Sequence, residues 1–237
     1  MRTVETPLVL VVDEDEKSRE LAKREFEAQG YEVKTTESFN EAVEVMESLP
    51  ERFLIYVNKL DIQEKIRATL EDLLTGLDNF QVFRKRAEAR LNPKDRMQPD
   101  VFSLLFIDVD EFGEFNRKHG HDQADEALIK IAAILRDHIR PSDIVCRRSG
   151  AADEFLVLLP GLNAAQARAR GEMLRELVSN SPLEKPGAII KFSISFGYSE
   201  VWRKDAADPK RDLAHLIDQA ERGSTGLHAR RKKERGY

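Results

Sequence analysis

Residues 147–155 read RRSGAADEF, and this stretch decides the fold that we expect. A run of small residues between two apolar segments favours a β-hairpin, with strands over 143–147 and 155–159. The acidic pair Asp153 and Glu154 comes directly before the second strand. Carboxylates in this place can meet a metal ion, and small residues let a phosphate approach the backbone closely. The hairpin is therefore the first candidate for a functional site.

Strands and helices are predicted to alternate on both sides of this hairpin. The strongly apolar segment 101–109 predicts a strand, and periodic apolar residues predict a helix over 122–140. Further elements are expected at 164–180 (helix), 189–198 (strand) and 213–222 (helix). This order is typical of a central sheet covered by helices.

The N-terminal part of the chain predicts a smaller βαβαβ unit. Its first strand, LVLVV at 8–12, is apolar throughout, as in a parallel strand that is buried on both faces. The elements that follow are a helix over 18–29 ending at Gly30, a strand over 31–35, a helix over 40–49 and a strand over 53–57. A charged helix is then expected over 61–74.

Composition limits the classes of partner. The chain has 237 residues with 41% hydrophobic residues, enough for one or two ordinary domains. Its net charge of -5 gives no reason to expect nucleic acid. A single cysteine fits a reducing compartment, and the apolar run at 8–12 is too short for a membrane span. We therefore expect a cytoplasmic protein without a membrane partner.

Several segments, taken in order, resemble the GGDEF family of bacterial diguanylate cyclases, which join two GTP molecules into cyclic di-GMP. The matching pieces are LTGLDN at 74–79, FIDVDEF at 106–112, Asn116, GH at 120–121, DEAL at 125–128, DEF at 153–155 and SISFG at 193–197. The resemblance runs from about Asp72 to the C-terminus. It implies an α/β protein whose GGDEF domain has a palm-like, mainly antiparallel central sheet.

The N-terminal unit looks like the first half of a response-regulator receiver domain. The receiver pattern places its phosphorylated Asp where this chain has Asn58, and a carboxamide cannot take up a phosphoryl group as a nucleophile. Asp13 and Glu14 stand at the receiver's metal-binding positions, or they simply start a helix. Asp61 is a second, weaker candidate for phosphorylation, because it lies past the end of the strand. We expect three parts: a truncated receiver-like module (1–60), a linker or signalling helix (61–75) and a degenerate GGDEF domain (76–237).

Half of a parallel sheet leaves an exposed edge, and exposed edges need cover. We therefore expect the N-terminal module to bind a protein partner or a second copy of the chain.

The resemblance also assigns roles to individual residues. It puts Asp108 and Asp153, with Glu154 beside them, at metal positions, and Asn116 and Asp125 at guanine-recognition positions. Carboxylate oxygens suit Mg²⁺, and an Asp or Asn can accept hydrogen bonds from a guanine edge. Otherwise these residues are surface groups at strand and helix ends.

The signature turn departs from the family. Two glycines precede the family's acidic pair, whereas this chain has Ala151 and Ala152, or carries a short insertion that puts Ser149 and Gly150 in those places. In the first alignment two Cβ atoms crowd a phosphate-facing turn. In the second the acids move relative to Asp108, and a shift of about 1 Å can cost roughly a hundredfold in rate.

Other positions have lost basic or acidic groups. Gly113 stands where the family has a lysine that serves the triphosphate, and Arg117 replaces an aspartate. Arg230 stands where a late helix usually carries a phosphate-contacting lysine, and Arg and Lys are not interchangeable at a specific site. We therefore expect impaired or absent catalysis, with no cofactor required and Mg²⁺ needed only for residual cyclase activity.

Arg140 and Asp143 match the family's RxxD motif, which binds the product in active relatives. An Arg can fork onto guanine or phosphate, and an Asp can accept from guanine N–H groups. Both are also common at a helix end and a turn. A further Arg from the next helix is replaced by Met173, with Arg170 and Arg175 on either side.

Three functions stay open at this point. The first is a binding module that senses cyclic di-GMP through Arg140 and Asp143 and signals to a protein partner. The second is a weakly active diguanylate cyclase with a tolerated hairpin change. The third is a scaffold that works without a nucleotide.

Overall fold

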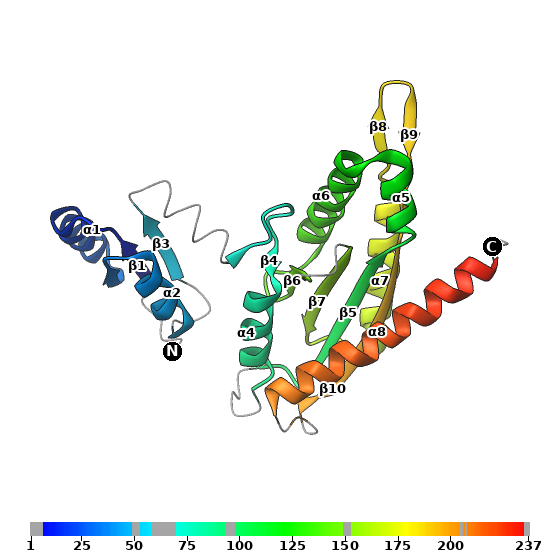
Figure 1. The fold of residues 1–237 in the computed structure, drawn as a ribbon. Coiled ribbons are helices and arrows are strands. Elements are labelled where there is room, and N and C mark those ends of the chain that lie inside the picture. The colour runs from blue at the N-terminus through cyan, green and yellow to red at the C-terminus, as the bar shows by residue number, and fades with distance from the viewer. Residues whose placement is uncertain are drawn as a thin grey trace. The chain divides into compact units, whose positions relative to one another are not determined.

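The computed structural model describes residues 7–48, 53–57, 70–92, 98–148, 153–203, 206 and 208–234. The chain forms two compact units, residues 1–70 and 71–237, called the N-terminal and C-terminal units below (Figure 1). Within the described ranges no helix is both long and apolar enough to cross a lipid bilayer.

The N-terminal unit is a three-stranded parallel sheet with a helix on each face. Strands β1 (Leu8–Val12), β2 (Glu32–Thr36) and β3 (Phe53–Val57) pair in the order β2-β1-β3. Alternate residues of β1 pack against α1 (Glu16–Ala28) and α2 (Phe39–Ser48), so β1 is buried on both faces. The predicted βαβαβ order is confirmed.

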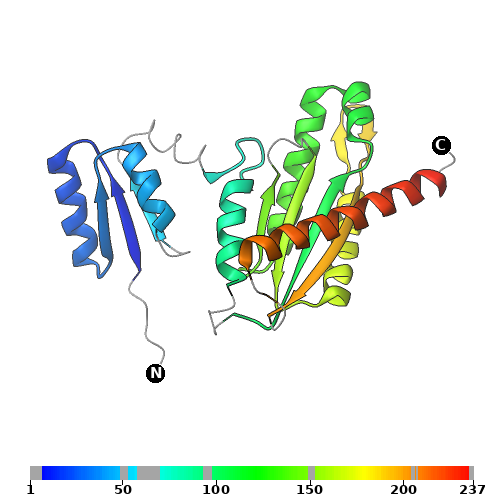
Figure 2. The same cartoon turned by 60° about the horizontal axis from the view of Figure 1, so that its bottom comes forward.

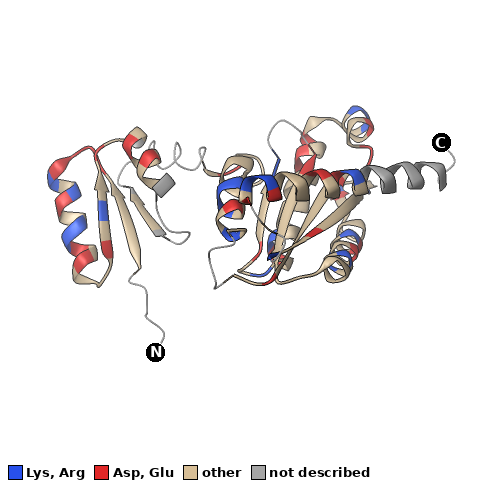
Figure 3. Ribbon diagram, turned by 90° about the horizontal axis from the view of Figure 1, so that it is seen from below, with Lys and Arg blue, Asp and Glu red and all other residues tan. Residues whose placement is uncertain are grey.

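Local capping explains where α1 begins and ends. The carboxylate of Asp15 accepts the backbone N–H of Ser18 at 2.8 Å, as an N-cap does. Gly30 follows the helix with a φ of 87°, a conformation that suits glycine. Acidic and basic residues alternate along the outer side of α1, which therefore faces solvent (Figure 3).

The helix predicted over 61–74 does not reach Leu74. Glu71 instead forms an isolated bridge with Asp78, and residues 73–75 form a turn. The carboxylate of Asp72 causes this reversal, because it accepts the backbone N–H of Thr75 at 2.9 Å and the hydroxyl of Thr75 at 2.7 Å. Such side-chain contacts to nearby backbone are typical of turns. Residues 58–69, which include Asn58 and Asp61, lie outside the described residues.

The C-terminal unit is built on a five-stranded sheet in the order β10-β5-β7-β6-β4. Its strands are β4 (Asp78–Asn79), β5 (Val101–Val109), β6 (Ile144–Arg147), β7 (Glu154–Pro160) and β10 (Ile194–Trp202). All neighbouring pairs are antiparallel except β4 with β6. The predicted mainly antiparallel sheet, with the signature hairpin formed by β6 and β7, is confirmed.

Helices cover both faces of this sheet (Figure 2). On one face, α4 (Phe80–Arg90) and α8 (Pro209–Glu234) pack on Leu104 and Phe106 of β5. On the other, α6 (His121–His138) and α7 (Ala164–Ser179) pack on Leu105 and Ile107. The short α5 (Phe112–His119) follows β5.

The strand predicted over 189–198 is in fact two strands. Ala188–Ile190 forms β9, which pairs with β8 (Leu183–Lys185) in a small hairpin, whereas β10 begins at Ile194. Gly187 makes the hairpin turn with a φ of 76°. Apolar content alone could not divide the segment, because the partner of β9 is a short local strand. The final helix is also longer than the predicted 213–222.

Helix α8 crosses β10 at Gly197, and this contact depends on the missing side chain. A Cβ placed there would lie 1.8 Å from the carbonyl oxygen of Ala220 and 2.4 Å from the backbone nitrogen of Ser224. Gly223 adds to the close approach, because its own Cβ would lie 3.4 Å from the Cα of Gly197. The packing of α8 on β10 therefore explains why Gly197 and Gly223 have no side chain.

We expect Gly197→Ala to lower the free energy of unfolding by about 3 kcal/mol or more, because neither α8 nor β10 can move without losing core contacts. Urea unfolding measures it. Gly113→Ala is the matched control, because its Cβ meets nothing within 4 Å. Ala in a helix is also favoured over Gly by about 0.5–1 kcal/mol. Equal effects of the two substitutions would contradict this account of the packing.

Candidate functional site

The predicted acids meet at one end of β5. Asp108 lies opposite Glu154 of β7 and opposite Ser195 of β10. Directly opposed residues of antiparallel strands point to the same face, so these side chains share the face that α4 and α8 cover. The backbone carbonyl of Asp153 accepts the N–H of Val109 at 3.2 Å, which brings Asp153 to the same end.

Asp110 ties the ends of β5 and β10 together. Its carboxylate accepts the hydroxyl of Ser195 at 2.6 Å and that of Ser193, and its backbone N–H donates to the carbonyl of Ser193 at 2.9 Å. Glu111 follows with a φ of 56°, the only positive value of a non-glycine residue in the described ranges. Strain of this kind costs energy and concentrates at functional sites.

Arg148 forms an ion pair with Glu154 of the signature. Its Nη1 donates to Oε2 of Glu154 at 2.8 Å and lies 3.3 Å from Oε2 of Glu221 on α8. The guanidinium also lies over the ring of Phe106, with 5.7 Å to the ring centroid. Sequence reasoning assigned no role to Arg148, because its second partner is 73 positions further along the chain.

The surroundings disfavour negative charge on the signature acids. Burial raises the pKa of Glu154, and the neighbouring Arg148 offsets part of that effect. Burial likewise raises the pKa of Asp153. A nearby cation favours the ionised form of each acid: Arg148 lowers the pKa of Glu154, and Arg147 lowers that of Asp153.

The carboxylates at this end of β5 already accept hydrogen bonds from other side chains of the protein. Among the residues that the structure describes, no group of three or more His, Cys, Asp or Glu side chains could hold a metal. One oxygen of Glu154 accepts from Arg148, and both oxygens of Asp110 accept from serines. Residues 149–152, where the two alignments of the turn differ, lie outside the described residues.

The two residues predicted to read guanine come from consecutive helices. Asn116 is on α5, and its Oδ1 is buried without a hydrogen-bond partner among the described residues. Asp125 is exposed in the second turn of α6. Buried polar atoms are rarely left unpaired, so Asn116 has the capacity to accept an N–H group of a base.

The RxxD residues form a tight turn between α6 and β6. Asp143 is buried, and its Oδ2 accepts the backbone N–H of Arg140 at 2.8 Å. The backbone N–H of Asp143 in turn donates to the carbonyl of Arg140 at 3.0 Å. Asp143 therefore stabilises the turn, while Arg140 is exposed at its start.

A second guanidinium lies beside this turn. Arg170 of α7 donates from Nη1 to the carbonyl of His138, two residues before Arg140, at 2.6 Å. Met173 packs against the core instead, and Arg175 pairs with Glu172 on its own helix. In the sequence Arg170 is notable only as a neighbour of Met173, which replaces the family's arginine. Its contact with the carbonyl of His138 shows that Arg170 lies beside the RxxD turn.

Asp13 of the N-terminal unit is engaged by residues close to it in the sequence. Asp13 is buried and accepts the backbone N–H of Asp15 at 2.9 Å, while its carbonyl accepts from Nη1 of Arg19 at 2.7 Å.

An ion pair links the start of the C-terminal unit to the signature hairpin. Nη1 of Arg147, the last residue of β6, donates to Oδ1 of Asp72 at 3.1 Å. Burial would raise the pKa of Asp72, but the hydrogen bonds from Thr75 and Arg147 outweigh it, so that the pKa is lowered.

The family described as diguanylate cyclase, GGDEF domain, matches residues 69–230. The chain belongs to the GGDEF family. The diguanylate cyclase DgcP of Pseudomonas aeruginosa is 29% identical over 199 residues, covering 84% of this chain and 28% of that protein. The response regulator PleD of Caulobacter vibrioides is 29% identical over 202 residues, covering 84% of this chain and 43% of that protein. The chain thus spans less than half the length of these two relatives.

Solved structures agree with this assignment. The GGDEF domain of FimX from Pseudomonas aeruginosa has a TM-score of 0.59 at 21% identity, covering 68% of this chain and 94% of that one, which shows the shared fold. The GGDEF domain of TpbB from the same organism has a TM-score of 0.53 at 31% identity, covering 62% of this chain and 84% of that one. Membership of the GGDEF family is consistent with turnover or binding of cyclic di-GMP.

In this GGDEF domain we expect Asp72→Asn to lower the free energy of unfolding at pH 7 by about 1–2 kcal/mol, the worth of hydrogen bonds to a charged group. Because the pKa of Asp72 is lowered in the folded state, its stabilisation is present above the unfolded value of 3.8 and is lost as pH falls through the folded pKa. Urea unfolding of both proteins between pH 7 and pH 3 measures this. The exposed Asp137 provides the control variant, Asp137→Asn, and a pH-independent difference for Asp72→Asn would contradict the assignment.

Proposed function

We propose that this GGDEF protein is a cyclic di-GMP effector that binds its ligand through Arg140 and Asp143 and has impaired or no cyclase activity. The observation that carries the proposal is the second guanidinium beside the RxxD turn, that of Arg170. The motif alone is weak, whereas Arg140 of the turn together with Arg170 of α7 brings two guanidinium groups to one place, which suits an anionic ligand.

The chemistry of the turn suits a ligand with guanine bases and phosphates. Arg140 is exposed, and a guanidinium can donate two parallel hydrogen bonds to a phosphate or to guanine O6 and N7. Oδ1 of Asp143 has only a 3.4 Å contact with the hydroxyl of Ser142, so it retains capacity to accept a guanine N–H. Pro141 limits the backbone freedom that binding would otherwise remove.

Impaired catalysis is supported by the way positive charge is distributed over the site. Gly113 and Arg117 replace residues of the family pattern on α5, and Arg148 holds the carboxylate of Glu154. A weakly active cyclase is the second candidate, favoured by the unpaired Oδ1 of Asn116 and by the direct opposition of Asp108 and Glu154.

We further propose that the N-terminal unit is a receiver-like module that binds a protein partner or a second copy of the chain. The match to PleD, named a response regulator, covers 84% of this chain, more than the C-terminal unit comprises. SiaD, a diguanylate cyclase, has been solved with its activator SiaC, an example of a GGDEF protein that assembles with a partner. A cytoplasmic location, expected from the single cysteine, belongs to the same proposal.

Titration calorimetry of the full chain with cyclic di-GMP tests the main proposal. We expect saturable binding that Arg140→Ala weakens at least about tenfold, because a charge-assisted contact is lost. Arg170→Ala should also weaken binding, whereas Arg168→Ala, an equal charge change at an exposed position of the same helix, should not. No heat with the wild-type protein would sink the proposal, and equal losses for Arg168 and Arg170 would remove Arg170 from the site.

The cyclase alternative has its own measurement. We expect incubation with GTP and Mg²⁺, followed by chromatography, to yield no cyclic di-GMP beyond that of the Asp153→Ala variant. Steady product formation that disappears in Asp153→Ala would establish the second candidate instead.

A further inference from the structure

We propose that Arg148 is an internal counter-ion that lowers the affinity of the signature site for divalent cations by keeping them away from Glu154. This inference rests on the impaired catalysis proposed above and gives it a cause in one side chain. It concerns the end of β6 opposite to the RxxD turn.

Arg148 is held by contacts on three sides. Its Nη1 donates to Glu154 at 2.8 Å and reaches Glu221 at 3.3 Å, and its guanidinium covers Phe106. Its backbone N–H also donates to the carbonyl of Glu154 at 2.9 Å, so the pairing of the hairpin strands fixes where the side chain starts. The Arg148 side chain is 31% exposed and that of Glu154 only 20%. Water and salt therefore screen the contact incompletely.

The position of Glu221 is set by the packing of α8. This helix cannot move away from β10 without losing the close approach at Gly197, and Glu221 directly follows Ala220, whose carbonyl makes that contact. The second carboxylate is therefore presented to Arg148 by a rigid element. Two carboxylates in fixed positions therefore stabilise the guanidinium of Arg148 where it lies.

A divalent ion at Glu154 would have to displace this guanidinium or bind beside it. In the first case the ion must break a charge-assisted hydrogen bond, and in the second it meets a like charge a few ångströms away. Mg²⁺ and Mn²⁺ also demand a near-regular shell of oxygen ligands, and Oε2 of Glu154 is already an acceptor. Arg148 thus supplies the positive charge that a metal would otherwise bring.

The inference is tested by titrating the full chain with Mn²⁺ in the absence of nucleotide. The electron paramagnetic resonance signal of the unbound ion measures how much Mn²⁺ is bound. Arg148→Gln removes the charge but keeps a polar side chain of similar reach. We expect it to bind Mn²⁺ about tenfold more tightly than the wild type, since removing one like charge nearby changes the affinity by about that factor.

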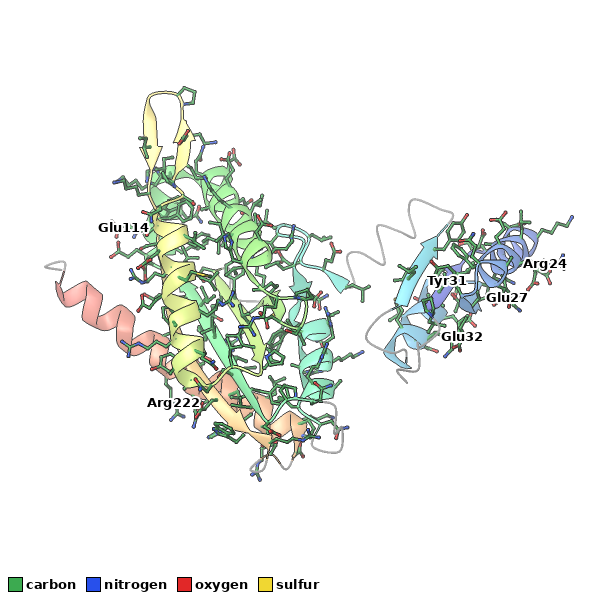
Figure 4. The ribbon with its side chains drawn as sticks, turned by 180° about the vertical axis from the view of Figure 1, so that it is seen from behind. Arg24, Glu27, Tyr31, Glu32, Glu114 and Arg222 are labelled. Atoms are coloured by element: carbon green, nitrogen blue, oxygen red, sulfur yellow. The ribbon has the colours of Figure 1, made fainter. Side chains whose placement is uncertain are left out.

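The matched control is Arg222→Ala. Arg222 lies on α8 (Figure 4), one position from Glu221, and its side chain is 78% exposed and paired with Asp218. It changes the net charge of the chain by the same amount, so we expect its Mn²⁺ affinity to stay within about twofold of the wild type because water and salt screen an exposed charge. Equal affinities of Arg148→Gln and Arg222→Ala would overturn the inference.

Two further measurements separate this result from other failures. Arg148→Lys keeps the charge, so it should bind Mn²⁺ no more than about threefold tighter than the wild type, whereas a gain equal to that of Arg148→Gln would refute the role of charge. Thermal unfolding checks that each variant is folded. The affinity of Arg148→Gln for cyclic di-GMP, measured by calorimetry, should equal that of the wild type. An unchanged Mn²⁺ affinity would therefore contradict only the role of Arg148, and an absence of cyclic di-GMP binding would contradict only the proposed ligand site.

Discussion

The antiparallel pairing of β5 with β7 on one side and β10 on the other is the constraint on which the C-terminal unit depends. One face of β5 contributes Leu104 and Phe106 to the layer under α4 and α8, and the opposite face contributes Leu105 and Ile107 to the layer under α6 and α7. The same register puts Asp108 opposite Glu154. A slip of one residue would turn both apolar sets to the wrong face, so the placement of the acids is held by the packing of the core.

Some of this could be predicted from the sequence because the signal is local. The runs at 8–12, 53–57 and 101–109 are apolar throughout most of their length, and each forms a strand with these bounds. Predictions failed where a partner distant in space or a side-chain cap decides the local structure. The carboxylate of Asp72 ends the expected linker helix before Leu74, and the hairpin of β8 and β9 divides the segment 189–198.

At the candidate site, too, local patterns could be predicted from the sequence and contacts between distant segments could not. The family pattern named Asp108, Asp153, Glu154 and Arg140, and the structure places the first three at one end of β5. The pattern could not name Arg148, whose role depends on how closely α8 approaches β10. Residue spacing carries no information about a contact between Arg148 and Glu221, because no local geometry relates a strand end to the middle of a helix 73 positions later.

Retention of the fold and change of the chemistry are physically separable in this chain. Gly113 and Arg117 lie on exposed positions of α5, and Arg148 directly follows the last residue of β6, so none of them belongs to the buried layers. Substitution at such positions changes the free energy of unfolding little, but it adds or removes a whole charge near the site. The family resemblance implies a triphosphate-binding lysine where this chain has Gly113, and Arg148 pairs with Glu154, which the resemblance places at a metal position. In our proposal positive charge is lost near the triphosphate and gained near the metal-binding carboxylate, and a GGDEF core tolerates both changes because its packing does not depend on these residues.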